Sequence, residues 1–155
     1  MAIARVYLAP GMFGFARLAA YEYFEHVETA IRSRFASDGV DVLVAELHPT
    51  ASIRRRAAHL TRLISETAGD DGPIHIVGHS TGGLDARLVA SPSVHLGAVA
   101  DTQMDWLARL RSVTSVNTPH YGTPLASFFA TAKGQQMLYA VSAITVTALT
   151  VGAPP

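Results

Sequence analysis

The sequence predicts an α/β fold, a three-layer sandwich in which helices cover both faces of a parallel sheet. Short apolar runs alternate with longer segments whose apolar residues recur every three or four positions. The segments between consecutive runs are long enough for helical crossovers, which make neighbouring strands parallel. A chain of 155 residues suits one domain with a buried core.

Composition excludes several classes of protein. The chain is 49% hydrophobic, 15% charged and formally neutral, which argues against disorder and against electrostatic attraction to nucleic acid. It contains no cysteine, so disulfides and thiolate metal sites are excluded, while the redox compartment stays open. The amino terminus runs from Met1 straight into a strand pattern, without the charged leader and apolar stretch of a secretory signal. We therefore expect a cytoplasmic location.

Four apolar runs bounded by Gly, Pro, Asp or Asn residues predict strands. They cover residues 3–8, 40–47, 74–77 and 111–116. No further strand-and-helix unit follows the fourth run, so we expect that strand to expose an unpaired edge of the sheet. An open edge predicts self-association.

Apolar residues at helical spacing predict the intervening helices. The first two stripes are Leu18, Tyr21, Phe24, Val27, Ile31 and Phe35, and then Ile53, Ala57, Leu60 and Ile64. A third helix is expected after Gly83, over residues 84–90, and a fourth over 125–132. The second helix carries four arginines, interpreted as a solvated basic face, with contact to an anionic membrane as the alternative: Arg54, Arg55, Arg56 and Arg62.

The third strand and third helix are joined by Gly78-His79-Ser80-Thr81-Gly82. This Gly-x-Ser-x-Gly pattern is typical of a sharp turn that lifts a nucleophilic serine out of a strand and onto the start of a helix. Both glycines have a steric reason, because a Cβ at Gly78 or Gly82 would collide with the neighbouring element. The pattern predicts that Ser80 is the nucleophile of an acyl hydrolase. The alternative is a plain glycine-rich turn; phosphate-binding and dinucleotide-binding spacings do not fit.

Three blocks of sequence carry a family resemblance: residues 8–15, 77–84 and 115–126. In order and spacing they resemble the bacterial triacylglycerol lipases of the α/β-hydrolase family, over roughly residues 3–130. The resemblance implies one α/β-hydrolase domain over residues 1–155, incomplete relative to the family. It also implies hydrolysis of acylglycerols or similar lipid esters through an acyl-enzyme on Ser80, with no cofactor.

The resemblance assigns an oxyanion hole to the backbone N–H groups of Met12 and Thr81. Such donors stabilise the negative charge that builds on the substrate carbonyl oxygen, by about 3–4 kcal/mol for each donor. Pro10 stands where the family usually has a histidine, which is a departure in the shape of this loop. The alternative for Met12 is an apolar loop residue that covers the core.

A catalytic serine needs a histidine to take its proton and a carboxylate to orient that histidine. In the family these partners follow the serine on later loops, and the chain ends before a segment that would carry them. Asp101 or Asp105 with His120 has the right order within the chain, so His120 is a candidate base. The resemblance instead makes His120 a structural neighbour, and His79 is expected to pack. Two alternatives therefore stay open: a non-enzymatic fragment with a binding or assembly role, and an acyltransferase or thioesterase.

The remaining features are secondary. Residues 137–151 are mostly apolar but fall short of the roughly 20 residues that span a bilayer as a helix. They suggest a buried helix or strand, or alternatively a lid or cap over an acyl site within residues 125–155. Trp106 is expected to fill the core. No metal site is expected, since His75 and His79 on a strand and turn do not converge.

Overall fold

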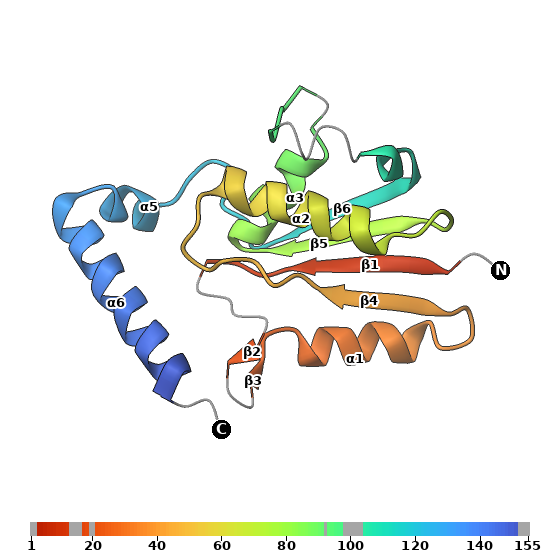
Figure 1. Cartoon of the computed structure of the whole chain (residues 1–155), viewed down its shortest axis with the longest axis horizontal. Helices are drawn as coiled ribbons and strands as arrows, with labels where there is room; N and C mark the ends of the chain where they lie inside the picture. Colours follow the sequence, from red (N-terminus) through yellow and green to blue (C-terminus); the bar gives the residue numbers. More distant parts are fainter. Residues whose placement is uncertain (1–2, 13–16, 19–20, 92, 98–103, 152–155) are drawn as a thin grey trace.

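The computed structural model describes residues 3–12, 17–18, 21–91, 93–97 and 104–151. Its main sheet has four parallel strands in the order β4-β1-β5-β6 (Figure 1). The strands are β1 (Ala4–Ala9), β4 (Val40–Val44), β5 (Ile74–His79) and β6 (Leu110–Val116). The predicted parallel sheet is confirmed, and the first and third predicted strands lie side by side as β1 and β5.

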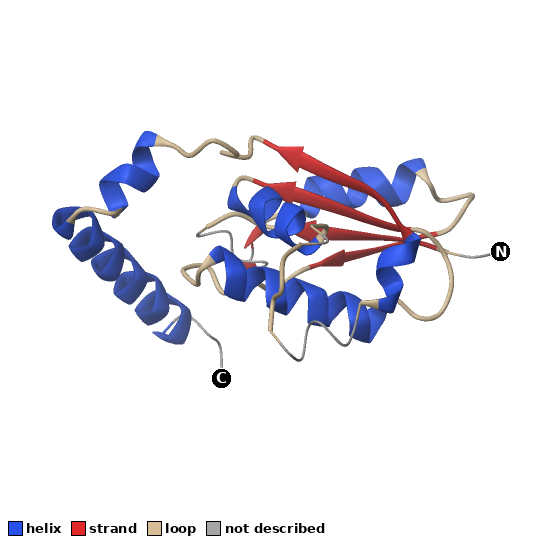
Figure 2. Cartoon of the chain, turned by 90° about the horizontal axis from the view of Figure 1, so that it is seen from above, coloured by secondary structure: helices blue, strands red, loops and turns tan. Residues whose placement is uncertain are grey.

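Helices cover both faces of this sheet, as the three-layer prediction requires (Figure 2). On one face lies α1 (Glu25–Arg34), and on the other lie α2 (Ile53–Thr67) and α3 (Thr81–Val89). Strand β1 contributes to two hydrophobic clusters: Tyr7 and Ala9 join the cluster of α2 and α3, whereas Val6 and Leu8 join the cluster beside α1. A parallel strand buried on both faces is mostly apolar, and the buried residues 6–9 made β1 recognisable in the sequence.

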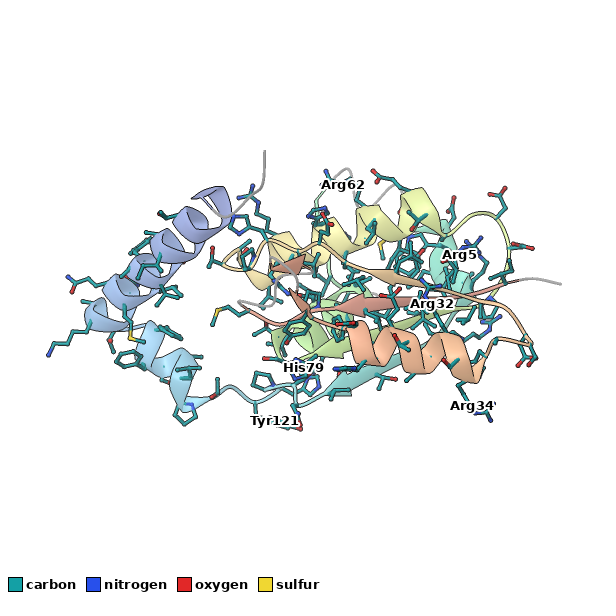
Figure 3. All side chains as sticks on the ribbon, turned by 90° about the horizontal axis from the view of Figure 1, so that it is seen from below. Arg5, Arg32, Arg34, Arg62, His79 and Tyr121 are labelled. Atoms are coloured by element: carbon teal, nitrogen blue, oxygen red, sulfur yellow. The ribbon has the colours of Figure 1, made fainter. Side chains whose placement is uncertain are left out.

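Helix α2 has the clearest local cause. Its N-cap Ser52 accepts a hydrogen bond from the Arg55 N–H, and Ala57, Leu60 and Ile64 are buried against the sheet and α3. The interpretation of its arginines as one solvated face is wrong at one position, because the Arg56 side chain is buried. Arg54, Arg55 and Arg62 are exposed, and Figure 3 shows Arg62 on the outside of the helix.

The first predicted helix begins later than its apolar stripe suggested. Residues 17–22 instead include a small antiparallel pair, β2 (Arg17–Leu18) and β3 (Tyr21–Glu22), in which Leu18 pairs with Tyr21. The three-residue spacing of Leu18 and Tyr21, which was interpreted as helical, therefore belongs to two paired strands. Helix α1 starts at Glu25 and contains no fully buried residue. Val27 of the predicted stripe is exposed, and so is Phe35, which lies beyond the helix.

Smaller differences concern the ends of elements. Strand β4 stops at Val44, three residues before the predicted end, although Ala45 and Leu47 stay buried in the following loop. Trp106 lies in the short 3₁₀ helix η1 (Asp105–Arg109) and packs in the core as predicted, while its Nε1 donates to Ser65 Oγ over 3.0 Å.

Strand β6 forms an edge of the sheet, with β5 as its neighbour in the described part of the chain. Six of its seven residues are exposed, including Val113 and Val116. The predicted unpaired edge is therefore confirmed, while self-association through it stays a prediction.

Beyond β6 the chain forms a helical arm, α5 (Pro124–Phe129) and α6 (Ala132–Val151), which extends away from the sheet (Figure 1). The helix predicted over 125–132 is thus split in two. The interpretation of residues 137–151 as buried is wrong, because Met137, Tyr139 and Ile144 are 51%, 73% and 68% exposed. Among the described helices, none combines the length and the apolar character needed to cross a membrane. A role of the arm as a lid stays a prediction.

Candidate active site

Ser80 occupies an unusual backbone conformation at the junction of β5 and α3. Its φ of 54° and ψ of −127° lie in a region that non-glycine residues adopt at a cost of about 1–3 kcal/mol. Two hydrogen bonds hold it there: the Ser80 N–H donates to the Val116 carbonyl over 2.9 Å, and its carbonyl accepts from the Gly83 N–H over 3.1 Å. The half-buried Ser80 thus stands at the carboxyl end of a central strand, where open α/β sheets place their chemistry.

The two motif glycines allow strand and helix to approach closely. A Cβ added to Gly78 would lie 2.4 Å from the backbone of Gly82 and Gly83, and one added to Gly82 would lie 2.1 Å from the Ala9 carbonyl oxygen. The collisions expected from the sequence are therefore confirmed. Their consequence is that α3 begins directly against the ends of both β1 and β5.

A third glycine, which sequence reasoning did not single out, brings the loop after β1 to Ser80. A Cβ on Gly11 would lie 2.8 Å from Ser80 Cβ and 3.1 Å from Ser80 Oγ. The register explains this contact, because Ala9 at the end of β1 pairs with Gly78 at the end of β5. The loop that carries Met12 and the turn that carries Ser80 and Thr81 therefore meet at one edge of the sheet, as expected. Met12 is half-buried in a turn.

A buried ion pair joins this loop to two helices. Arg56 of α2 and Asp85 of α3 are 2% and 0% exposed, and Arg56 Nη2 lies 2.8 Å from Asp85 Oδ2. The guanidinium also donates through Nε to Asp85 Oδ2 over 2.9 Å, through Nη1 to the His48 carbonyl over 3.1 Å, and through Nη2 to the Pro10 carbonyl. One side chain thus ties the loop after β1, the loop after β4 and the helix of the serine turn together.

The sequence did contain a signal for this arginine. Arg56 lies three residues after Ile53 and four before Leu60, so it belongs to the apolar stripe of α2 rather than to its outer face. A cation on the buried stripe of a helix calls for a carboxylate partner on the facing element. Asp85 is the corresponding residue on α3.

Burial has a large electrostatic effect on Asp85. Desolvation raises the pKa of its carboxyl from 3.8 to about 6, even though the hydrogen bond and the charge of Arg56 both act to lower it. The carboxyl is therefore about half ionised near pH 6, so the ion pair strengthens above this pH and weakens below it. Asp85 Oδ1 has no hydrogen-bond partner among the described residues, and the same is true of Thr81 Oγ1.

The two candidate histidines have other partners. His79 Nδ1 lies 2.5 Å from the hydroxyl of Tyr23, which precedes α1, and Figure 3 shows His79 at the end of the sheet that faces α5. His120 Nδ1 lies 3.5 Å from Arg87 Nη1, in the loop that follows β6. The expectation that His79 packs against the fold agrees with its contact with Tyr23.

The carboxylates proposed to partner His120 differ in position. Asp105 opens η1, directly before β6 begins, and thus lies at the amino end of the strands. Ser80 and His120 follow the carboxyl ends of β5 and β6, about 20 Å away for strands of this length. The structure therefore does not bring Asp105 to His120 and Ser80. Asp101 lies outside the described residues.

The amino end of the strands carries a separate cavity. It has a volume of about 500 Å³ and is lined mainly by the end of α2 and by η1, including Glu66, Trp106 and Arg109. The guanidinium of Arg109 is occupied by backbone carbonyls of residues 68–72. Within the described ranges, no group of three or more His, Cys, Asp or Glu residues could hold a metal ion.

Comparisons with known proteins agree with this geometry. No family model matches the chain. A triacylglycerol lipase of Vibrio cholerae is 31% identical over 123 residues, covering 78% of this chain and 34% of the lipase. A triacylglycerol lipase of Pseudomonas fragi is 30% identical over the same number of residues, covering 78% of this chain and 36% of the lipase. The chain thus spans about a third of the length of these relatives.

Solved structures support the fold. A metagenomic carboxyl esterase superposes with a TM-score of 0.54 at 23% identity, covering 84% of this chain and 35% of the esterase. EstA from Clostridium botulinum superposes with a TM-score of 0.50 at 16% identity, covering 82% of this chain and 39% of EstA. The similarity to the two lipases, together with the parallel sheet and the serine turn after β5, identifies the chain as a member of the α/β-hydrolase family, of the lipase and esterase type.

Proposed function

We propose that the site hydrolyses carboxylic esters of the acylglycerol class, with Ser80 as the nucleophile. Ser80 Oγ attacks the acyl carbon, the alcohol leaves, and water releases the acid from the acyl-enzyme. The observation that carries the proposal is the position of Ser80, held at positive φ beyond a central strand with Gly11 packed against its side chain. The substrate class rests on the relatives, which are named triacylglycerol lipases.

The two amide donors proposed for the oxyanion are the N–H groups of Met12 and Thr81. Pairing of β1 with β5 supports this, because it sets the loop of Met12 beside the first turn of α3. Each donor would stabilise the tetrahedral intermediate by about 3–4 kcal/mol. A substitution that pushes Gly11 away from Ser80 would also move the Met12 N–H away from the oxyanion.

A second candidate function is a fragment that binds or assembles without turnover. The observation that favours it is the separation of Asp105 from Ser80, since no described carboxylate is shown orienting a histidine toward the serine. Loss of a triad member lowers turnover by roughly a millionfold. The two functions therefore differ in whether a base activates Ser80. That base would be His120 or a residue outside the described part of the chain.

A fluorophosphonate probe tests the proposal directly, because it reacts with activated serines. We expect the folded chain to be labelled on Ser80, located by mass spectrometry, and Ser80→Ala to be unlabelled. Ser37→Ala, in the exposed turn after α1, is the matched control and should label as the native chain does. A native circular dichroism spectrum with no labelling would favour the non-enzymatic fragment.

Substrate panels separate the alternatives that share the fold. Hydrolysis of tributyrin and short nitrophenyl esters is the expected result for a lipase or esterase. Faster turnover of acyl thioesters, or acyl transfer to an added alcohol in preference to water, would favour a thioesterase or an acyltransferase. The cytoplasmic location and any contact of α2 with an anionic membrane remain predictions.

A further inference from the structure

Helix α3 carries two buried polar atoms that lack hydrogen-bond partners among the described residues. They are Thr81 Oγ1 and Asp85 Oδ1. Buried polar groups are almost always paired, directly or through an ordered water, because an unpaired one loses its hydration without compensation. One of the two is a hydroxyl that can donate, and the other is a carboxylate oxygen that accepts. The two atoms therefore complement each other.

We propose that the Thr81 hydroxyl donates a hydrogen bond to Asp85 Oδ1, by rotation about χ1 or through one buried water, and thereby positions the oxyanion loop through Arg56. The proposal rests on the function proposed above for its catalytic consequence. It assigns Thr81 a side-chain role in addition to the role of its backbone N–H. Thr81 is in this respect a positioning residue.

The helix brings the two side chains together. Residues 81 and 85 are one turn apart on α3, and the Cβ atoms of such pairs lie about 5–6 Å apart on the same face. Side chains of a helix lean toward its amino terminus, so the Asp85 carboxylate lies over the turn that contains Thr81. A gap of this size is closed by a rotated hydroxyl or by a single water molecule.

The pair continues a network that already reaches the oxyanion loop. Asp85 Oδ2 accepts from Arg56, and Arg56 donates to the Pro10 carbonyl, two residues before Met12. With the Thr81 hydroxyl added, hydrogen bonds connect Thr81 to the loop of Met12 across the buried side of the site. Both proposed oxyanion donors would then be held by one network, in which the ionised Asp85 is the central acceptor.

Few of the described groups around Asp85 stabilise its ionised carboxyl, so a hydrogen bond from the Thr81 hydroxyl would have a clear effect on its pKa. Burial raises its pKa to about 6, and Arg56 from α2 is the charged group that opposes this rise. The loop after β1 presents the Pro10 carbonyl and the loop after β4 the His48 carbonyl, while the His48 ring faces Thr50. Arg111 is the charged residue of β6, but it lies at the amino end of the strand and donates to the Ala108 carbonyl. On α3 itself, Arg87 is exposed near His120.

The test compares Thr81→Val, which keeps the shape and removes the hydroxyl, with Thr81→Ser, which restores it. The first measurement is the titration of the Asp85 carboxyl by carbon NMR. Because a donated hydrogen bond favours the ionised form, Thr81→Val should raise the pKa of Asp85 by about one unit, and Thr81→Ser should return it to the native value. The second measurement is the rate at which the fluorophosphonate labels Ser80 as a function of pH. The pH at which this rate falls on the acidic side should rise by the same amount in Thr81→Val only.

Thr61→Val is the matched control. Thr61 Oγ1 is also buried without a described partner, but it lies on α2, five residues beyond Arg56 and so about 7.5 Å further along that helix. The Arg56 side chain reaches back toward the Pro10 and His48 carbonyls, away from Thr61. Thr61→Val should leave both the Asp85 titration and the labelling profile unchanged.

The outcomes separate this proposal from the proposed function. An unchanged Asp85 titration in a folded Thr81→Val protein would overturn the hydrogen bond. A shifted titration with an unshifted labelling profile would overturn the positioning role. If the native chain is not labelled at all, the proposed function fails, while the NMR titration still decides the hydrogen bond. Should Thr81→Val not fold, the comparison of Thr81→Ala with Thr81→Ser gives the same two readouts.

Discussion

The sheet with its serine turn and the helical arm formed by α5 and α6 differ in how far their apolar residues are buried. Both are rich in apolar residues, but Tyr7, Leu8 and Ile76 in the central strands are fully buried, whereas Tyr139 and Ile144 in the arm are 73% and 68% exposed. Two helices packed on the sheet, α2 and α3, hold a buried ion pair, and the turn after β5 holds a strained serine. Strain and buried charge persist only where surrounding contacts determine the structure, which supports the proposed site at the sheet rather than on the arm.

The largest expected difference concerns the buried arginine. Arg56→Met removes the partner of Asp85 and of the Pro10 carbonyl, so it leaves a desolvated carboxylate. We expect a loss of about 3–5 kcal/mol in the free energy of unfolding, measured by urea denaturation, together with slower labelling of Ser80. Arg55→Met, one position earlier and exposed, should change stability by less than about 0.5 kcal/mol.

A compensating change distinguishes stability from positioning. Arg56→Met combined with Asp85→Leu replaces the ion pair by apolar side chains and should recover much of the lost stability. Labelling of Ser80 should stay slow, because nothing then holds the Pro10 carbonyl. Native labelling in the stable double variant would contradict a positioning role of Arg56.

The next largest loss of stability is expected where a glycine allows a close backbone contact. Gly82→Ala places a Cβ 2.1 Å from the Ala9 carbonyl oxygen, at the contact between α3 and the end of β1. The sheet must therefore distort to relieve the collision. We expect a loss of about 3 kcal/mol or more in the free energy of unfolding. Gly134→Ala makes an equally close contact, 2.0 Å from the Phe128 carbonyl oxygen, but within the arm. Thermal unfolding of the sheet should therefore stay unchanged in Gly134→Ala, and a large loss there would show that arm and sheet unfold together.

The pH dependence of stability isolates Asp85. Its pKa rises from 3.8 to about 6 on folding, so between these values the folded state binds a proton that the unfolded state has released. The Asp85 contribution to the free energy of unfolding therefore falls as pH rises through this window, by about 2–3 kcal/mol for a shift of this size. The decline should be visible as a difference between the native chain and Asp85→Asn, measured from pH 3 to 8. Parallel stability curves for the two proteins would contradict the raised pKa.

The open edge of the sheet predicts a smaller effect that depends on concentration. Strand β6 has one charged residue, Arg111, and no proline, so it lacks the usual protection of an edge strand. We expect light scattering to show association that increases with protein concentration. Val113→Lys on the edge should reduce it, whereas Tyr139→Lys on the arm should not, if the edge and not the arm is the contact. A monomer at high concentration would count against association through β6.

The comparison of the two regions also explains what the sequence could predict. The inner strands β1 and β5 and helix α2 were predictable because the signals are local: the apolar period and the N-cap Ser52 are visible in the chain itself. The serine turn was predictable because its glycines have a steric cause. Arg56 was misinterpreted as a surface residue although it lies on the apolar stripe of α2, because the carboxylate that permits its burial is 29 residues away on another helix. Leu18 and Tyr21 were misinterpreted as helical because two residues that pair across antiparallel strands can have the same sequence spacing as one turn of a helix.

The arm was misjudged for a different physical reason. Apolar composition predicts that a segment will be buried, but it does not say against what. In the sheet the covering elements belong to the described chain, since α1 covers one face while α2 and α3 cover the other. Among the described elements, α6 packs mainly against α5. Composition alone could therefore not separate a core helix from an exposed one.

The smallest expected effect tests this difference with one substitution made twice. Ile64→Val removes a methylene from a fully buried side chain of α2, and such changes cost about 0.5–1.5 kcal/mol. Ile144→Val makes the same change on α6, where the side chain is 68% exposed, and should alter the free energy of unfolding by less than about 0.5 kcal/mol. Both values come from urea denaturation at one protein concentration. If the two losses were equal, the arm would be packed in solution as tightly as the core, and the contrast between the regions would fail.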